Sequence, residues 1–277
     1  MRAYPIFVPF RDEHLAAMLT LPEDEPRGLL LQMTGLGAHR SHRFGIWTRT
    51  AALLADRGIA SIRFDYRGVG ESTGDLGVWH MADIPAGQAT AVLRFGMEAT
   101  GARRAAAAGN CGGAWTALVV GARIPECEGV AFIRAPILAP ARRGRLTHRA
   151  SRSGIGALLR SNKLARTTVR AVLNRKPKRA VDLAAGHAEV LSRGRILFLF
   201  GEEDYHVNET ARGDLERLSS RLTPEQRSRY ELRIIPGRSL AGFESLETQD
   251  LVVDAMVDWT TALFAGTRPA ELAPAAR

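Results

Sequence analysis

Residues 104–121 read RAAAAGNCGGAWTALVVG, and this stretch decides the fold. The apolar run 104–108 predicts a strand, the following Gly-Asn-Cys-Gly-Gly predicts a tight turn, and 114–121 predicts a helix. The order is that of a nucleophile elbow, G-x-nucleophile-x-G between strand and helix, with Cys111 where a serine is usual. Glycines on both sides suit it, because the nucleophile in such a turn has a strained backbone conformation.

Strand-like and helix-like segments alternate outward from the turn, which predicts a doubly wound α/β sheet. An antiparallel pair is expected to open the chain, and parallel strands to follow. The predicted strands are 6–9, 15–21, 28–33, 59–64, 104–108, 129–133, 195–200 and 230–235, and the predicted helices are 44–57, 81–98, 114–121, 214–222 and 246–264.

The composition fits one α/β domain in a reducing compartment. The chain has 277 residues, 45% hydrophobic residues and two cysteines, too few for a disulfide framework. We find no apolar run long enough to span a membrane and no signal peptide, so we expect a cytoplasmic protein. No motif indicates a cofactor or a metal site.

The net charge of +9 comes from one segment. Residues 141–180 hold 13 Lys or Arg and no acidic residue, which leaves 25 basic and 29 acidic residues elsewhere. We interpret 140–187 as a basic helical cap inserted into a core formed by 1–139 and 188–265, followed by a mobile tail at 266–277. The cap is either a solvated surface or a docking surface for an acidic partner. Residues 141–180 contain no aromatic side chain, which argues against nucleic acid as that partner.

Four segments in this order resemble the α/β-hydrolase superfamily. They are TGLG at 34–37, IRFDYRGVGES at 62–72, GNCGG at 109–113 and ILFLFGEED at 196–204. With a cysteine at the elbow, the sequence resembles the subset of the family that uses a cysteine nucleophile. This subset includes thioesterases, acyl-transfer enzymes and Dieckmann-type cyclases. The resemblance implies an α/β-hydrolase fold with a helical cap.

The resemblance also implies roles for particular residues. Cys111 would be the nucleophile and Asp204 would occupy the position of the acid. The backbone N–H groups of Leu36 and Gly112 would form the oxyanion hole.

The sequence departs from the family at the histidine. All seven histidines lie at or before residue 206, whereas the family's base follows the last strand. The slot falls at Leu240 or Ala241, and neither can carry a proton. His206, His80 and His39 are the possible substitutes.

A cysteine without this base favours some reactions over others. A thiol at a helix N-terminus gains thiolate character from the local field, whereas water needs a general base to hydrolyse an acyl-enzyme. We therefore expect acyl transfer or cyclisation of an acyl or thioester substrate, in a biosynthetic pathway. An acidic carrier protein or coenzyme A would deliver it to the basic cap. The alternatives are a non-covalent enzyme of the same fold and a non-catalytic binding protein.

Overall fold

The structure is a computed structural model that describes residues 1–35, 38–75, 84–138, 181–204, 212–240, 243 and 245–265. The chain divides into two compact units, one formed by Met1–Leu138 with Leu183–Arg277 and one by Ala139–Asp182. All described helices and strands lie in the first unit. Among the described helices, none is long and apolar enough to cross a membrane.

Eight strands in the described ranges form one sheet, in the order β1-β2-β4-β3-β5-β6-β7-β8. The first hairpin, β1 with β2, is antiparallel, β2 runs antiparallel to β4, and all other neighbours are parallel. The strands are β1 (Arg2–Phe10), β2 (Glu13–Leu21), β3 (Leu29–Met33), β4 (Ala60–Phe64), β5 (Ala105–Asn110), β6 (Cys127–Ile133), β7 (Arg195–Gly201) and β8 (Tyr230–Ile235).

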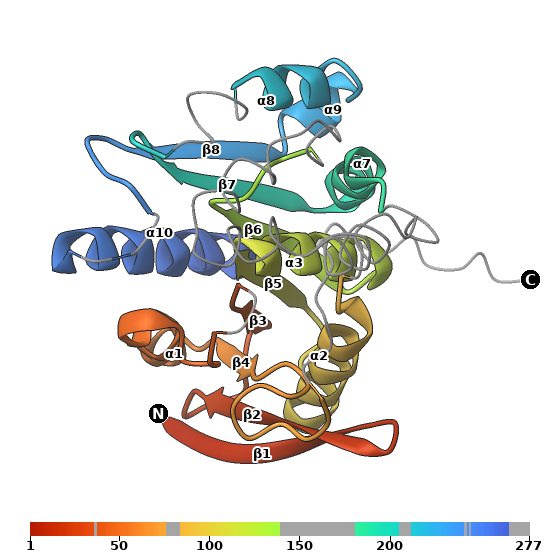
Figure 1. Ribbon diagram of the computed structural model, residues 1–277, viewed down its shortest axis with the longest axis vertical. Coiled ribbons are helices and arrows are strands. Elements are labelled where there is room, and N and C mark those ends of the chain that lie inside the picture. Colours follow the sequence, from red (N-terminus) through yellow and green to blue (C-terminus); the bar gives the residue numbers. More distant parts are fainter. Residues whose placement is uncertain are drawn as a thin grey trace, which may run out of the picture. The chain divides into compact units, whose positions relative to one another are not determined.

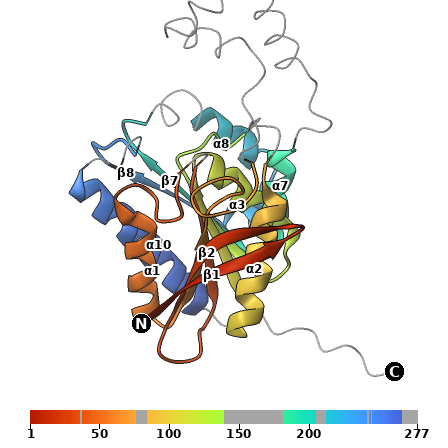
Figure 2. The same ribbon diagram turned by 60° about the horizontal axis from the view of Figure 1, so that its bottom comes forward.

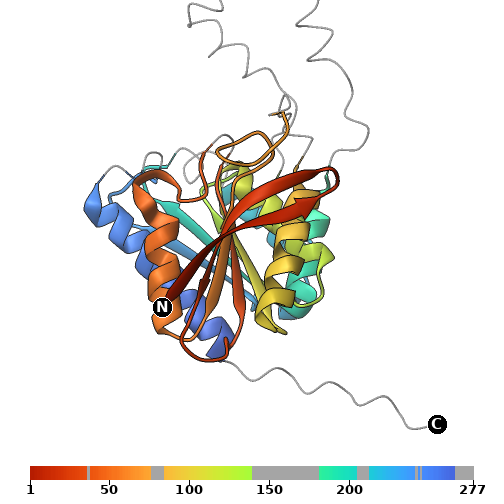
Figure 3. The same ribbon diagram turned by 90° about the horizontal axis from the view of Figure 1, so that it is seen from below.

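The helices cover both faces of the sheet (Figures 1 and 3). They are α1 (Ile46–Asp56), α2 (Ala86–Thr100), α3 (Gly112–Arg123), α7 (Leu183–Arg193), α8 (Arg212–Ser219), α9 (Pro224–Arg227) and α10 (Leu246–Ala265), with a 3-10 turn, η1 (Arg43–Gly45), before α1. Helices α1 and α10 pack together on one face, and α2, α3 and α7 cover the other (Figure 3). The β1–β2 hairpin forms one end of the sheet and lies in front in the view of Figure 2.

Burial explains why the central strands are uniformly apolar. Every residue of β3 and β4 is buried, as are the first five of β5, because helices lie on both faces of a parallel sheet. One large core cluster joins α1 and α10 to the sheet and includes Trp47, Met256 and Leu240. The α/β-hydrolase fold predicted from the sequence is thus confirmed.

The helices differ more from the predictions than the strands do. Helix α2 begins at Ala86, after Pro85, rather than at 81. Helix α1 begins at Ile46 because Phe44 and Gly45 both have positive φ values, 56° and 67°, which an α-helix cannot contain.

The predicted boundary of the cap at 187 is wrong at its C-terminal end. Residues Leu183–His187 belong to α7, which packs on α3 in the first unit. Leu183, His187, Val190 and Leu191 are buried at the spacing of one helical face. Residues 139–180 and the tail 266–277 lie outside the described residues.

Candidate functional site

Cys111 stands alone between the last residue of β5 and the first of α3. Its backbone has φ 53° and ψ −124°, an uncommon combination for a residue with a Cβ atom. Its N–H donates to the carbonyl O of Ile133 at 3.0 Å, which ties the turn to β6. The thiol is exposed. The predicted strand, turn and helix therefore occur in place, with the sulfur presented to solvent at the carboxyl edge of the sheet.

Glycines allow this turn to close. A Cβ atom on Gly109 would overlap the carbonyl of Gly113, and one on Gly113 would overlap the carbonyl of Thr34. The two chain segments therefore approach each other at backbone distance. A residue with a side chain at either position forces the elbow open.

The turn after β3 lies against the elbow, as an oxyanion hole requires. A Cβ atom placed on Gly35 would be 3.3 Å from the Cβ of Cys111, and the Gly35 N–H donates to Asn110 Oδ1 at 3.0 Å. Gly112 is the first residue of α3, so its N–H has no acceptor one turn earlier in the helix. Leu36, the other predicted donor, lies outside the described residues.

Asp204 follows β7 and is 1% exposed. Its Oδ1 accepts hydrogen bonds from Arg134 Nε at 3.2 Å, Ser239 Oγ at 2.9 Å and Leu240 N at 3.0 Å. Its Oδ2 accepts from Gly201 N at 2.9 Å. The carboxylate is thus already satisfied by the protein, with a guanidinium as its charged partner.

Arg134 was not singled out from the sequence. It is the first residue after β6, with φ 45°, and its N–H donates to Leu199 O at 2.9 Å. Asn110 pairs with Ile133 in the β5–β6 register. The residues that follow them, Cys111 and Arg134, therefore lie side by side at the ends of neighbouring strands. An arginine directly after an apolar strand was the available signal, because polar residues at the carboxyl ends of parallel strands line the site in such folds.

The slot expected for the histidine holds a core residue. Leu240 is fully buried in the cluster with α1 and α10, and only its N–H reaches Asp204. Its side chain is therefore packing, not lining the site. Ala241, His206 and His80 lie outside the described residues.

The remaining predicted substitute, His39, is exposed and lies beside Gly70. His42, which was not among the predicted substitutes, is 9% exposed and packs edge-on against Phe243 and Trp47, with ring centroids 4.9 and 5.8 Å apart. Burial lowers the pKa of His42 and so favours the neutral form of the ring. In the part of the chain that the structure describes, neither histidine forms a hydrogen bond with Cys111.

A family model for the serine aminopeptidase family S33 matches residues 24–224, which is more than half of the chain. The chain belongs to this family. The match spans the elbow, the turn after β3 and the acid loop. Within this range the chain carries a cysteine, Cys111, at the elbow. Family membership identifies the protein as an α/β-hydrolase-family enzyme.

Solved structures with the same fold include several esterases and hydrolases. The structure of Est1E from Butyrivibrio proteoclasticus with ferulic acid bound aligns over 94% of this chain and 100% of its own, with 16% identity and a TM-score of 0.64. The Pyrococcus furiosus esterase Pf2001 aligns over 95% and 93%, with 13% identity and a TM-score of 0.66. Dienelactone hydrolase from Anabaena variabilis aligns over 95% and 98%, with 19% identity and a TM-score of 0.62. At these identities the likeness shows the fold alone.

No curated protein matches the chain by sequence.

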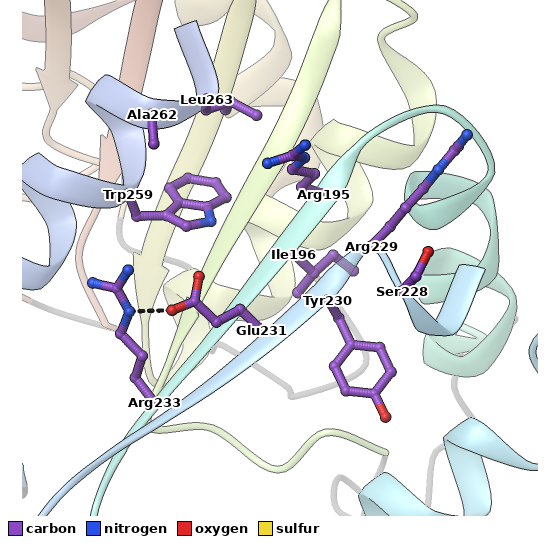
Figure 4. Close-up of a pocket in the computed structure, with 10 residues that line it drawn as sticks. All are labelled: Arg195, Ile196, Ser228, Arg229, Tyr230, Glu231, Arg233, Trp259, Ala262 and Leu263. Atoms are coloured by element: carbon purple, nitrogen blue, oxygen red, sulfur yellow. Dashed lines mark hydrogen bonds and ion pairs between the residues drawn. The ribbon is translucent and has the colours of Figure 1, made fainter. Parts of the chain in front are cut away.

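A hollow of about 220 Å³ lies at the amino ends of β7 and β8 (Figure 4). It is lined where β7 and β8 begin, by Arg195, Tyr230 and Glu231, and by Trp259 of α10. Cys111 follows the end of its strand, whereas these residues stand at the starts of theirs. This hollow is thus separate from the elbow.

Proposed function

We propose that this protein is an α/β-hydrolase-family enzyme that accepts an acyl group on Cys111 and passes it to a nucleophile other than water. The substrate is an acyl thioester or a related activated acyl compound. The product is formed by acyl transfer or, where the second nucleophile belongs to the same molecule, by cyclisation. Such bond-forming chemistry suits a biosynthetic pathway.

The geometry of the elbow supports the first step. The Cys111 thiolate attacks the carbonyl carbon of the thioester, a new C–S bond forms, and the original thiol leaves as a thiolate. The Gly112 N–H at the start of α3 is placed to donate to the oxygen that becomes negative. Because one thioester replaces another, this exchange requires no large driving force.

The bonding of Asp204 is the observation that carries the preference for transfer. In a hydrolase triad the acid orients a histidine that activates water. Here Asp204 holds Arg134, Ser239 and the backbone of Leu240 instead, and the side chain of Leu240 is in the core. An amine or a stabilised carbanion is a stronger nucleophile than water, and an alcohol that belongs to the bound substrate gains reactivity by being held close to the acyl group. The nucleophile attacks the acyl carbon, the C–S bond breaks, and the Cys111 thiolate is regenerated, while the proton of an attacking amine or alcohol passes to solvent.

The segment 141–180 supplies the second part of the proposal. Its 13 basic and no acidic residues would attract an acidic carrier protein or the phosphates of coenzyme A. Delivery by either would bring a thioester to the elbow. The segment lies outside the described residues, so this role rests on its composition.

The test is intact-mass spectrometry of the wild type, Cys111→Ala and Cys127→Ala after incubation with a panel of acyl thioesters. An acyl adduct on the wild type and on Cys127→Ala, but not on Cys111→Ala, is expected. The adduct should persist in buffer and disappear when an amine or a carbon nucleophile is added.

Two other outcomes assign the protein to the alternative functions. Turnover of a substrate that survives alkylation of Cys111 indicates a non-covalent enzyme. Binding of acyl compounds with neither adduct nor turnover indicates a binding protein.

A further inference from the structure

A second hollow, of about 570 Å³, lies over β2 and β4 beside the loop that follows the turn after β3. Its lining includes two arginines, Arg40 and Arg63, together with His39, Ser41 and Glu71. The proposed acyl chemistry at Cys111 uses none of these side chains.

Arg63 is a buried cation with almost nothing to balance it. It lies in β4, where it pairs with Met18 of β2 and Gln32 of β3, and it is 7% exposed. Its Nη1 donates to Thr20 Oγ1 at 3.2 Å, while its Nε has no hydrogen-bond partner within the described part of the chain. A guanidinium removed from water without a carboxylate is costly to the folded protein.

The acidic groups beside Arg40 are already paired. Arg40 donates to the buried carboxylate of Asp65 and to Glu71, forming ion pairs with both. The Arg40 N–H also donates to Asp65 Oδ1 at 2.6 Å. Asp65 and Glu71 thus serve Arg40, and the described residues contain no ion pair for Arg63.

Arg63 nevertheless stays charged at neutral pH. Burial, followed by the nearby positive charge of Arg40, lowers the pKa of Arg63 to about 10. Both causes disfavour the charged guanidinium, whereas an anion beside it would favour the charged form. Buried arginines in proteins are found with such partners because the planar guanidinium donates to two oxygens at once.

We propose that this hollow is a binding site for a phosphate group, with Arg63 as the principal ligand and Ser41 as a second donor. The phosphate is either free or the phosphate ester of a larger molecule, since the hollow exceeds the volume of one phosphate ion. The loop that forms the wall of the hollow follows the turn after β3, which lies against the elbow at Gly35. In this turn Thr34 Oγ1 donates to Ala38 O at 2.9 Å. A phosphorylated substrate bound here would therefore be held beside the turn that contacts Cys111.

The test measures binding of inorganic phosphate to the wild type by the rise in melting temperature, at constant ionic strength set with NaCl. Three variants are compared with it. Arg63→Met replaces the cation by a neutral side chain of similar length. Arg49→Met is the matched control, because Arg49 is an exposed arginine paired with Asp250. Ser41→Glu places a carboxylate at the half-buried rim of the hollow.

The expected result is phosphate stabilisation of the wild type and Arg49→Met, with affinity at least tenfold weaker for Arg63→Met and for Ser41→Glu. Ser41→Glu should itself melt higher than the wild type in the absence of phosphate, because its carboxylate compensates Arg63. Equal phosphate affinity for all four proteins would overturn the proposal. So would the absence of any phosphate effect on the wild type. Should Arg63→Met fail to fold, Ser41→Glu decides the question alone.

The same melting-temperature measurement with pantetheine and 4′-phosphopantetheine distinguishes free phosphate from a phosphate ester. Stabilisation by the phosphorylated compound well beyond inorganic phosphate indicates a phosphate ester of a thioester carrier, and equal stabilisation indicates free phosphate. Neither measurement involves acylation of Cys111, so failure of the proposed acyl transfer leaves this result unchanged.

Discussion

The Nε of Arg134 lies 3.2 Å from the Oδ1 of Asp204, a carboxylate that is fully buried while the guanidinium side chain is a quarter exposed. The ion pair joins the end of β6 to the loop after β7. It gives the Asp204 carboxylate a fixed cationic partner beside the elbow. The carboxylate thereby holds the Arg134 side chain in place.

Replacing this arginine exposes the cost of burying the acid. Arg134→Gln leaves Asp204 with neutral donors only and is expected to lower the free energy of unfolding by about 1 to 3 kcal/mol, since removal of one partner strands the other. Urea denaturation measures the change. Arg49→Gln breaks an exposed pair with Asp250 and should change stability by less than about 1 kcal/mol. Equal losses in the two variants would mean that the Arg134–Asp204 pair contributes no more than a surface pair.

The backbone of Cys111 predicts a stabilising substitution. At φ 53° and ψ −124° a residue with a Cβ atom carries strain of about 1 to 3 kcal/mol, which glycine avoids. Cys111→Gly is therefore expected to unfold at a higher urea concentration than Cys111→Ala, although glycine adds entropy to the unfolded chain. Both variants lack the thiol, so the difference between them isolates the backbone. A Cys111→Gly protein less stable than Cys111→Ala would show that the turn carries no such strain.

The two cysteines should react very differently. Cys111 is exposed, whereas Cys127 is fully buried and burial raises its pKa to about 12. Iodoacetamide at pH 8 is expected to label the native protein once, at Cys111, and the denatured protein twice. Peptide mapping by mass spectrometry locates the label. Labelling of Cys127 in the native state would contradict the packing of β6.

Restoring a histidine at the slot should not restore a triad. Leu240→His buries an imidazole among apolar side chains, and Asp204 Oδ1 already accepts from three donors. We expect a loss of about 2 to 4 kcal/mol in unfolding free energy and no gain in thioester hydrolysis. Leu240→Met, which nearly conserves volume, should cost less than about 1.5 kcal/mol. A stable Leu240→His protein with faster hydrolysis would show that the loop can still present a base.

The buried His187 gives the protein an acid-sensitive stability. Burial lowers its pKa to about 4, whereas the unfolded chain has the ordinary value of about 6.5. Between these values the unfolded state binds the proton and the folded state does not. The contribution of about 3 kcal/mol is complete above pH 6.5 and is lost as the pH falls toward 4.

The comparison of wild type with His187→Gln checks this assignment. Urea unfolding at several pH values should show a smaller loss of stability on acidification for the variant, because glutamine does not titrate. Parallel pH profiles for the two proteins would exclude His187 as the cause.

Local patterns were sufficient to predict the strands and the elbow. The apolar runs that became β3, β4 and β7 are buried on both faces, so their composition alone marks them. Helix α7 was missed because its first residues, 183–187, were assigned to the cap and no helix was predicted for the residues that follow. The short α9 was missed although Thr223 and Gln226 form a capping box, a signal present in the sequence.

The sequence by itself determined where the chain turns and which turn presents a thiol, because a glycine requirement and an apolar run act over a few residues. Only the tertiary structure decided what the acid binds. Arg134 and Asp204 are 70 positions apart, and they meet because β6 and β7 are neighbours in the sheet. The burial of Leu240 and the uncompensated charge of Arg63 have the same origin. Solvation and charge balance depend on which segments the sheet order brings together, and no short stretch of sequence contains that information.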